Sequence, residues 1–181
     1  YWFGSHGQLK YEIAEIVASR AIAAGIRCDI STRPEDTIVG EEWISFLGSG
    51  RCTIGTESGS SVIDGRGEVQ ARIKRLLDAT PNLSFSEVDH QMDPGWDDHP
   101  ITAVSPRHFE AIATKTCQIL VEGEYNGIFV PGRHYIALKR DFSNLDEVLE
   151  EIKDVNHTAQ IAQTAYEEIF LNEKYSYKQF A

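Results

Sequence analysis

Apolar residues recur at helical spacing along much of the chain, which predicts six helices. Gly25 ends the first of them, as glycine does at many helix C-termini. Another helix starts at Ser105-Pro106, because serine accepts hydrogen bonds from unpaired amides and proline suits the first helical position. Ser143 and Asp146 resemble a capping box at the start of a later helix. By number, the expected helices are about 9–24, 40–47, 69–77, 106–113, 145–152 and 158–169.

Shorter apolar stretches between these helices predict strands. The sequence opens at Tyr1, close to its first apolar positions, so we expect it to begin inside or just before a strand of a longer protein. Strands and helices alternate, which favours an α/β fold: a Rossmann-like parallel sheet with helices on both faces. Ligands of such sheets bind at the carboxyl ends of the strands. The expected strands are Ile26–Ile30, Cys52–Gly55, Cys117–Val121, Ile128–Val130 and Tyr135–Leu138.

Two stretches have no clear period. Glu57–Ser61 is a run of small residues that predicts a loop, and residues 83–100 carry the turn formers Pro94 and Gly95. The length of 181 residues fits one compact domain. We therefore expect a single Rossmann-like domain over 1–181 with an irregular insertion at about 63–100.

The charge of the chain narrows the possible partners. The formal net charge is −11, with 28 acidic and 17 basic residues. Nucleic-acid binding needs clustered Lys and Arg, and docking on an anionic membrane needs positive charge, so both are disfavoured. No apolar run approaches the ~20 residues of a membrane span.

The cysteines indicate a compartment rather than a site. Cys28, Cys52 and Cys117 are odd in number, widely spaced and set in apolar stretches. This pattern favours buried free thiols in a reducing cytoplasm over disulfides or metal binding.

The segment that begins at Ser105-Pro106 carries the most chemical information. The amides and dipole at the amino end of its helix form an anion site suited to a diphosphate. Arg107 adds a planar group that matches phosphate oxygens. Glu110 lies one turn further on, where a carboxylate can accept both hydroxyls of a ribose. The alternative is a surface ion pair between Arg107 and Glu110, which are three positions apart.

This segment also resembles a signature of known enzymes. The pattern Arg-x-Phe-Glu-Ala-x-Ala-x-x-Thr, followed by an apolar strand, resembles the Glu-Ala-x-Ala-x-Gly-Thr signature of GT-B glycosyltransferases. It is closest to the branch with CgeB-like spore maturation proteins and group 1 glycosyltransferases, which also carry Ser-Pro-Arg before this helix. The resemblance covers the chain from about Ile101 onward. It continues through Glu122–Gly127, Pro131-Gly132, Asp141–Leu145 and Tyr175–Tyr177.

The resemblance implies a donor-binding half of a two-domain enzyme. Glu110 would hold the ribose of a nucleotide-diphosphate sugar, and the helix headed by Ser105 and Pro106 would face the diphosphate with Arg107. Tyr125, Asn126 and Gly127 would lie near the sugar or diphosphate. An amino-terminal acceptor domain, absent from this sequence, would bind the glycan or other acceptor. GT-B enzymes require no cofactor and no bound metal, since helix dipoles and basic side chains stabilise the leaving diphosphate.

Two positions depart from the family pattern. Many members have a second glutamate eight residues before the first, where this chain has Thr102, and Lys115 replaces the usual glycine. Glu57 follows an earlier strand and is the candidate for the missing carboxylate, as a catalytic residue of a motif split by the insertion. The alternative is that Glu57 caps a turn.

Four further features of the sequence bear on a possible site. Gly4-Ser5-His6-Gly7 is expected to join the first strand to the first helix, where glycines let the backbone approach phosphates, although a plain flexible turn explains it equally well. The acidic and histidine residues of 89–99 match no standard metal-ligand spacing, so a solvated acidic loop is favoured there. No Gly-x-Ser-x-Gly elbow is present, which argues against a hydrolase. Trp96 lies in the irregular stretch and is the tryptophan to watch.

The sequence therefore predicts a domain that binds a nucleotide-diphosphate sugar and takes part in sugar transfer to an acceptor. One alternative is a nucleotide-sugar epimerase of the same fold. Another is a non-catalytic module that binds a nucleotide or a protein.

Overall fold

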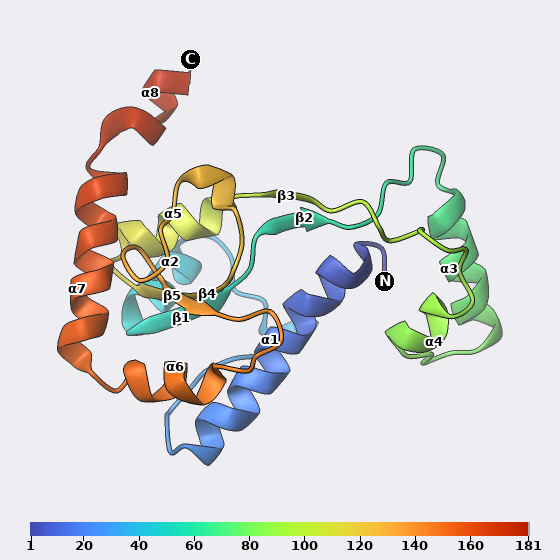
Figure 1. Ribbon diagram of the computed structural model, residues 1–181, viewed down its shortest axis with the longest axis horizontal. Helices are drawn as coiled ribbons and strands as arrows, with labels where there is room; N and C mark the ends of the chain where they lie inside the picture. The colour runs from blue at the N-terminus through green and yellow to red at the C-terminus, as the bar shows by residue number, and fades with distance from the viewer. Residues whose placement is uncertain (181) are drawn as a thin grey trace. The chain divides into compact units, whose positions relative to one another are not determined.

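The computed structural model describes residues 1–180, which fall into two compact units. The first unit consists of Tyr1–Glu12 and Ser58–Thr102. The second consists of Ile13–Glu57 and the chain from Ala103 onward. The helix α1 (Gly4–Ala23) contributes its first turns to one unit and its remainder to the other (Figure 1).

The second unit is built on a three-stranded parallel sheet in the order β1-β4-β5. Cys52 of β1 pairs with Cys117 of β4, and Ile119 of β4 pairs with Ile136 of β5. All five residues of the central strand β4 are buried, as expected for a parallel strand covered on both faces. The strands are β1 (Cys52–Gly55), β4 (Cys117–Val121) and β5 (Ile136–Leu138).

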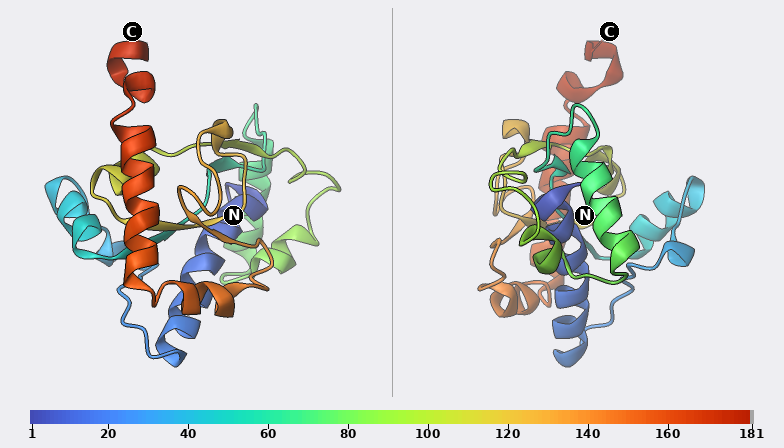
Figure 2. Two further views of the ribbon diagram at one scale, coloured as in Figure 1. Left: turned by 60° about the vertical axis from the view of Figure 1, so that its left-hand side comes forward. Right: turned by 90° about the vertical axis from the view of Figure 1, so that its right-hand side faces the viewer.

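Helices flank this sheet, so the expected α/β class is confirmed and the unit is consistent with a Rossmann-like half-domain. The helix α5 packs against β4 and α2, α6 packs against β5, and α7 packs against β4 (Figures 1 and 2). The helices of this unit besides the later part of α1 are α2 (Glu41–Ser49), α5 (Pro106–Ala113), α6 (Leu145–Glu151), α7 (Val155–Ala165) and α8 (Tyr177–Phe180). Shorter helical turns are η1 (Pro34–Asp36), η2 (Tyr125–Gly127), the π-helical η3 (Tyr166–Phe170) and η4 (Glu173–Tyr175).

An aromatic and aliphatic cluster forms the core beside the sheet. Leu120 of β4 meets Ile112 of α5, and the rings of Tyr125, Phe129 and Tyr135 fill the space between them and α7. Tyr125 and Phe129 lie 5.7 Å apart between ring centroids. The buried members are Ile112, Leu120, Tyr125, Phe129, Tyr135, Ala165 and Ile169.

The first unit contains the stretch expected to be irregular. A small two-stranded sheet pairs β2 (Ser58–Ser60) with β3 (Ile101–Ala103), and the amphipathic helix α3 (Glu68–Ala79) forms where apolar spacing predicted it. The stretch 83–100 is less irregular than expected, because it contains the helix α4 (Phe85–Asp89). Ser84 and Glu87 close a capping box around the start of α4, a signal that the sequence analysis missed.

Several predictions of local structure were wrong. Ile26–Ile30 and Ile128–Val130 are not strands, and Ser58–Ser60 is a strand rather than part of a loop. The alternating and apolar patterns are real, but Ile26–Ile30 has no ladder partner and Phe129 is buried by ring packing. The capping box at Ser143 is also absent, since α6 starts after Asn144 and Ser143 instead donates its amide to Asp141.

The structure also bears on the cysteines and on the possibility of a membrane span. Cys28, Cys52 and Cys117 are free thiols, of which Cys117 is buried and the other two are half-buried. Within residues 1–180, none of the helices combines the length and apolar character needed to cross a membrane.

Candidate functional site at the carboxyl end of the sheet

Three segments of the second unit meet where the parallel strands end. Glu57 follows β1, and its Oε1 accepts a hydrogen bond from the Tyr125 amide at 2.8 Å. Asn126 follows β4, and its Oδ1 accepts from the Val104 amide at 2.7 Å, directly before the amino end of α5. The two bonds join Glu57, the loop after β4 and the start of α5, which are three of the segments predicted from the sequence.

The loop after β4 has an unusual backbone. Tyr125, Asn126 and Gly127 are three successive residues with positive φ, at 44°, 54° and 67°. Positive φ is costly for a bulky side chain, and such strain persists only where the surroundings fix it. The Tyr125 ring is fully buried and its hydroxyl donates to the Val121 carbonyl at 2.7 Å. The structure therefore holds this loop in one conformation from both sides.

A close approach explains the glycine at position 123. A Cβ added to Gly123 would lie 2.6 Å from Glu57 Oε2 and 3.1 Å from the Tyr125 ring. Only glycine fits there without moving its neighbours. Gly123 lies within the Glu122–Gly127 segment of the glycosyltransferase resemblance. The physical need for glycine at this position, which is the contact with Glu57, is visible only in the structure.

Tyr125 contributes its backbone to this site and its side chain to the core. Burial raises the pKa of its hydroxyl. Its neighbours Asn126 and Gly127 are exposed. Of the three residues expected near a donor sugar, Asn126 and Gly127 are thus open to a ligand and the Tyr125 side chain is not.

The amino end of α5 differs from the expectation of free amides. Ser105 caps the helix, and its Oγ accepts from the Arg107 amide at 3.3 Å. The Ser105 carbonyl accepts from the His108 amide at 3.0 Å, and Pro106 has no N–H. The first amides of the helix are therefore occupied, and anion binding there depends on the helix dipole and on Arg107.

Arg107 and Glu110 both contact a tryptophan that the sequence analysis did not include in the site. The Trp43 indole of α2 donates from Nε1 to Glu110 Oε2 at 2.7 Å, and the Arg107 guanidinium carbon lies 5.9 Å from the centre of the Trp43 ring. The described residues show these contacts in place of the alternative Arg107–Glu110 ion pair. Contact across two helices has no signal in sequence spacing, which is why Trp43 was missed.

His108 is a second residue missed by the sequence analysis. It is 4% exposed, and its Nδ1 lies 3.0 Å from Gln118 Oε1 of β4. Burial lowers the pKa of His108, so the ring is neutral. Its Nε2 is buried and has no hydrogen-bond partner within the part of the chain that the structure describes.

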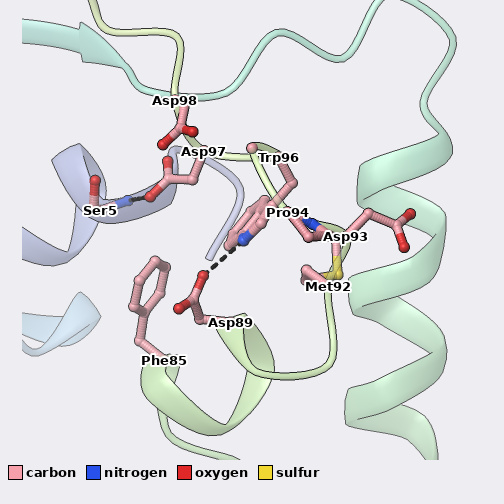
Figure 3. Close-up of a pocket in the computed structure, with 10 residues that line it drawn as sticks. Ser5, Phe85, Asp89, Met92, Asp93, Pro94, Trp96, Asp97 and Asp98 are labelled. Carbon is pink, nitrogen blue, oxygen red and sulfur yellow. Dashed lines mark hydrogen bonds between the residues drawn. The ribbon is translucent and has the colours of Figure 1, made fainter.

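Gly4 and Ser5 occupy a different setting from the one predicted. They begin α1 in the first unit and do not join a strand to a helix. The Ser5 amide donates to Asp97 Oδ2 at 2.7 Å (Figure 3). The Ser61 hydroxyl donates to Asp97 Oδ1, and the His6 amide donates to Ser61 Oγ at 3.1 Å. A Cβ on Gly4 would lie 1.7 Å from Asp97 Oδ1, so glycine does permit a close approach, but to a carboxylate of the chain itself.

The same acidic segment lines a cavity of about 500 Å³ in the first unit. Three of its carboxylates already have partners. Asp97 binds the start of α1, and Asp89 accepts from the Trp96 indole at 2.7 Å (Figure 3). Asp93 pairs with Arg72. Trp96 thus packs within the segment. Among residues 1–180, no group of three or more His, Cys, Asp or Glu side chains is placed to hold a metal ion.

Comparison with protein-family models gives no match, and comparison with curated proteins finds no similar sequence. The glycosyltransferase resemblance therefore enters the functional assignment as a hypothesis.

Proposed function

We propose that the second unit binds the nucleotide part of a nucleotide-diphosphate sugar and serves as the donor-binding half of a glycosyltransferase. One observation carries the proposal: Glu57, the loop after β4 and the start of α5 meet at the carboxyl end of a parallel sheet. Open α/β sheets bind ligands at this edge. The sequence pattern independently places its candidate donor residues in two of these three segments.

Each residue has a separate role in this proposal. Glu110 accepts the ribose hydroxyls, and Arg107 with the helix dipole stabilises the diphosphate as it leaves. Asn126 and Gly127 line the sugar end. Glu57 supports the Asn126 loop through the Tyr125 amide, which is a positioning role rather than the catalytic one first considered. The sugar is transferred to an acceptor bound outside this unit, and the three free cysteines support a reducing, cytoplasmic setting.

Calorimetric titration with UDP, GDP, CDP and dTDP tests the proposal. We expect one of these nucleotides to bind with a stoichiometry of one, and Glu110→Ala to weaken its binding about tenfold, the cost of a hydrogen bond to a charged group. Glu147→Ala is the matched control, because Glu147 is an exposed carboxylate on α6, which packs against β5. Failure of all four nucleotides to bind would reject the proposal and leave the non-catalytic protein-binding module.

A sugar-nucleotide assay separates transfer from epimerisation. Incubation with the sugar nucleotide of the preferred base, followed by chromatography, should return the donor with its sugar unchanged in configuration. Accumulation of an epimer would favour the epimerase alternative.

A further inference from the structure

Trp43 stands between the two candidate ligand-binding side chains of α5. Its Nε1 donates to Glu110 Oε2 at 2.7 Å, while its ring lies beside the Arg107 guanidinium at 5.9 Å. Trp43 and Glu110 are both half-buried. A hydrogen bond to a carboxylate is strongest when it is shielded from water, so this contact restricts the rotamer of Glu110.

The helix that carries Trp43 is firmly seated. Leu47 of α2 is 3% exposed, and its carbonyl accepts a hydrogen bond from the Thr116 hydroxyl at 2.8 Å. The Phe46 ring stacks on Trp43 with a centroid distance of 6.0 Å and an interplanar angle of 28°. The indole is thus supported by Phe46 of its own helix, and the helix is held by Thr116, directly before β4. The helix α2 in turn packs against α5 (Figure 1).

The Trp43 hydrogen bond engages one of the two carboxylate oxygens of Glu110. Glu110 Oε2 is occupied by the indole, and Oε1 accepts no hydrogen bond from the residues that the structure describes. A carboxylate fixed in this way presents one oxygen in a defined direction, which suits recognition of a vicinal diol better than a freely rotating side chain does.

We propose that Trp43 is a positioning residue: it aligns Glu110 so that the site distinguishes ribose from 2′-deoxyribose. This inference rests on the proposed nucleotide-binding function and adds a specificity to it. Trp43 itself does not contact the nucleotide in this arrangement; it acts through Glu110.

Paired titrations test this role. The probes are UDP with 2′-deoxy-UDP, GDP with 2′-deoxy-GDP, and CDP with 2′-deoxy-CDP, on the whole chain and on Trp43→Phe. We expect the unmodified chain to prefer the ribonucleotide of its best pair about tenfold, and Trp43→Phe to bring that ratio close to one. Phenylalanine keeps an aromatic ring at this position and removes the indole N–H donor together with part of the ring area.

Ile44→Val is the matched control, since Ile44 is an exposed residue of the same helix and the change leaves Trp43, Phe46 and Glu110 in place. A purely structural role for Trp43 would lower the affinity for both members of a pair equally, and an unchanged ratio in Trp43→Phe would overturn the inference. If the ratio disappears in Glu110→Ala but persists in Trp43→Phe, the nucleotide-binding proposal stands and this inference falls. Tightest binding of dTDP would also overturn it.

A second measurement leaves Trp43 in place and does not depend on the folding of Trp43→Phe. In a Trp2→Phe/Trp96→Phe background, Trp43 is the remaining tryptophan of the sequence. Its emission should shift on titration with the preferred ribonucleotide and shift less with the deoxy analogue. Equal shifts with both, or none with a nucleotide that calorimetry shows to bind, would contradict the coupling.

Discussion

At the scale of single residues, the loop after β4 shows how a backbone atom and a carboxylate fix each other. Glu57 accepts from the Tyr125 amide and at the same time lies against Gly123. The positive φ of Tyr125 places its ring in the core and its amide toward Glu57. The loop conformation is therefore set by the Glu57 bond to the Tyr125 amide, the approach of Glu57 to Gly123 and the burial of the Tyr125 ring. No short sequence pattern specifies these three contacts.

Gly123→Ala should disturb this arrangement. The new methyl group would lie 2.6 Å from Glu57 Oε2 and must displace it, so we expect a loss of about 1–3 kcal/mol in the free energy of unfolding. Urea denaturation followed by circular dichroism measures it. Gly65→Ala is the control, because nothing lies within 4 Å of a Cβ at that glycine, and it should be neutral or slightly stabilising. Equal stability of the two variants would show that the Glu57 side chain can move away from residue 123 at no cost in stability.

At the scale of elements, Glu168 of η3 binds two residues of the loop before β5, Arg133 and His134. Arg133 donates to it from Nε at 2.8 Å and also from its terminal nitrogen, and His134 Nε2 lies 2.9 Å from the same carboxylate. The Val130 amide donates to His134 Nδ1, which leaves Nε2 to donate to Glu168. Hydrogen bonds from Arg133 and then His134 lower the pKa of Glu168 from 4.5 to about 2.

A defined acid dependence of stability follows from this depressed pKa. Above the unfolded-state value of 4.5 the carboxylate is charged in both states and its stabilisation is complete; as the pH falls from 4.5 through about 2 that stabilisation is lost. Urea midpoints measured between pH 7 and pH 2 should fall across this window. In Glu168→Gln the midpoint should be lower at pH 7 and fall less steeply in acid, whereas Glu167→Gln should keep the full acid dependence. A Glu168→Gln profile parallel to that of the unmodified chain would rule this explanation out.

The elements also show where sequence patterns succeed. Apolar residues at helical spacing predicted the later part of α1 and the helices α2, α3 and α5. The spacing of apolar residues that buries one face of a helix is a local property of the sequence. Short strands were less predictable: Ile26–Ile30 has the right alternation but no neighbouring strand, and Ser58–Ser60 has weak strand residues but a partner in β3. Pairing is a long-range property, so residue pattern alone does not decide it.

At the scale of the whole molecule, the chain's division into two units was not foreseen. A single domain with an insertion at about 63–100 was expected, whereas 58–102 and the first twelve residues together form one compact unit. The bonds responsible join residues far apart in sequence, as Ser5 and Asp97 do. The candidate site was likewise predicted only in part. Local sequence patterns identify Ser105, Arg107, Glu110 and Asn126, whereas Trp43 reaches the site through tertiary packing of α2 on α5.

Asp97→Asn should weaken the first unit specifically. The carboxylate accepts from the Ser5 amide at the amino end of α1, where a negative charge complements the helix dipole. We expect a loss of about 1–2 kcal/mol and faster hydrogen exchange at Ser5 and His6, read by mass spectrometry of amino-terminal peptides. Asp98→Asn, the exposed neighbour, should leave exchange in this segment unchanged. Unaltered exchange in Asp97→Asn would mean that the cap is dispensable.

The separation of 92 positions between Ser5 and Asp97 has a consequence for how the protein is made. During synthesis the start of α1 leaves the ribosome long before the carboxylate that caps it. Until that carboxylate arrives, the Ser5 amide has only water to bind, and the helix begins with a frayed end. The first turn of α1 should thus be among the last parts of this unit to become ordered, after the segment that carries Asp97 has been translated.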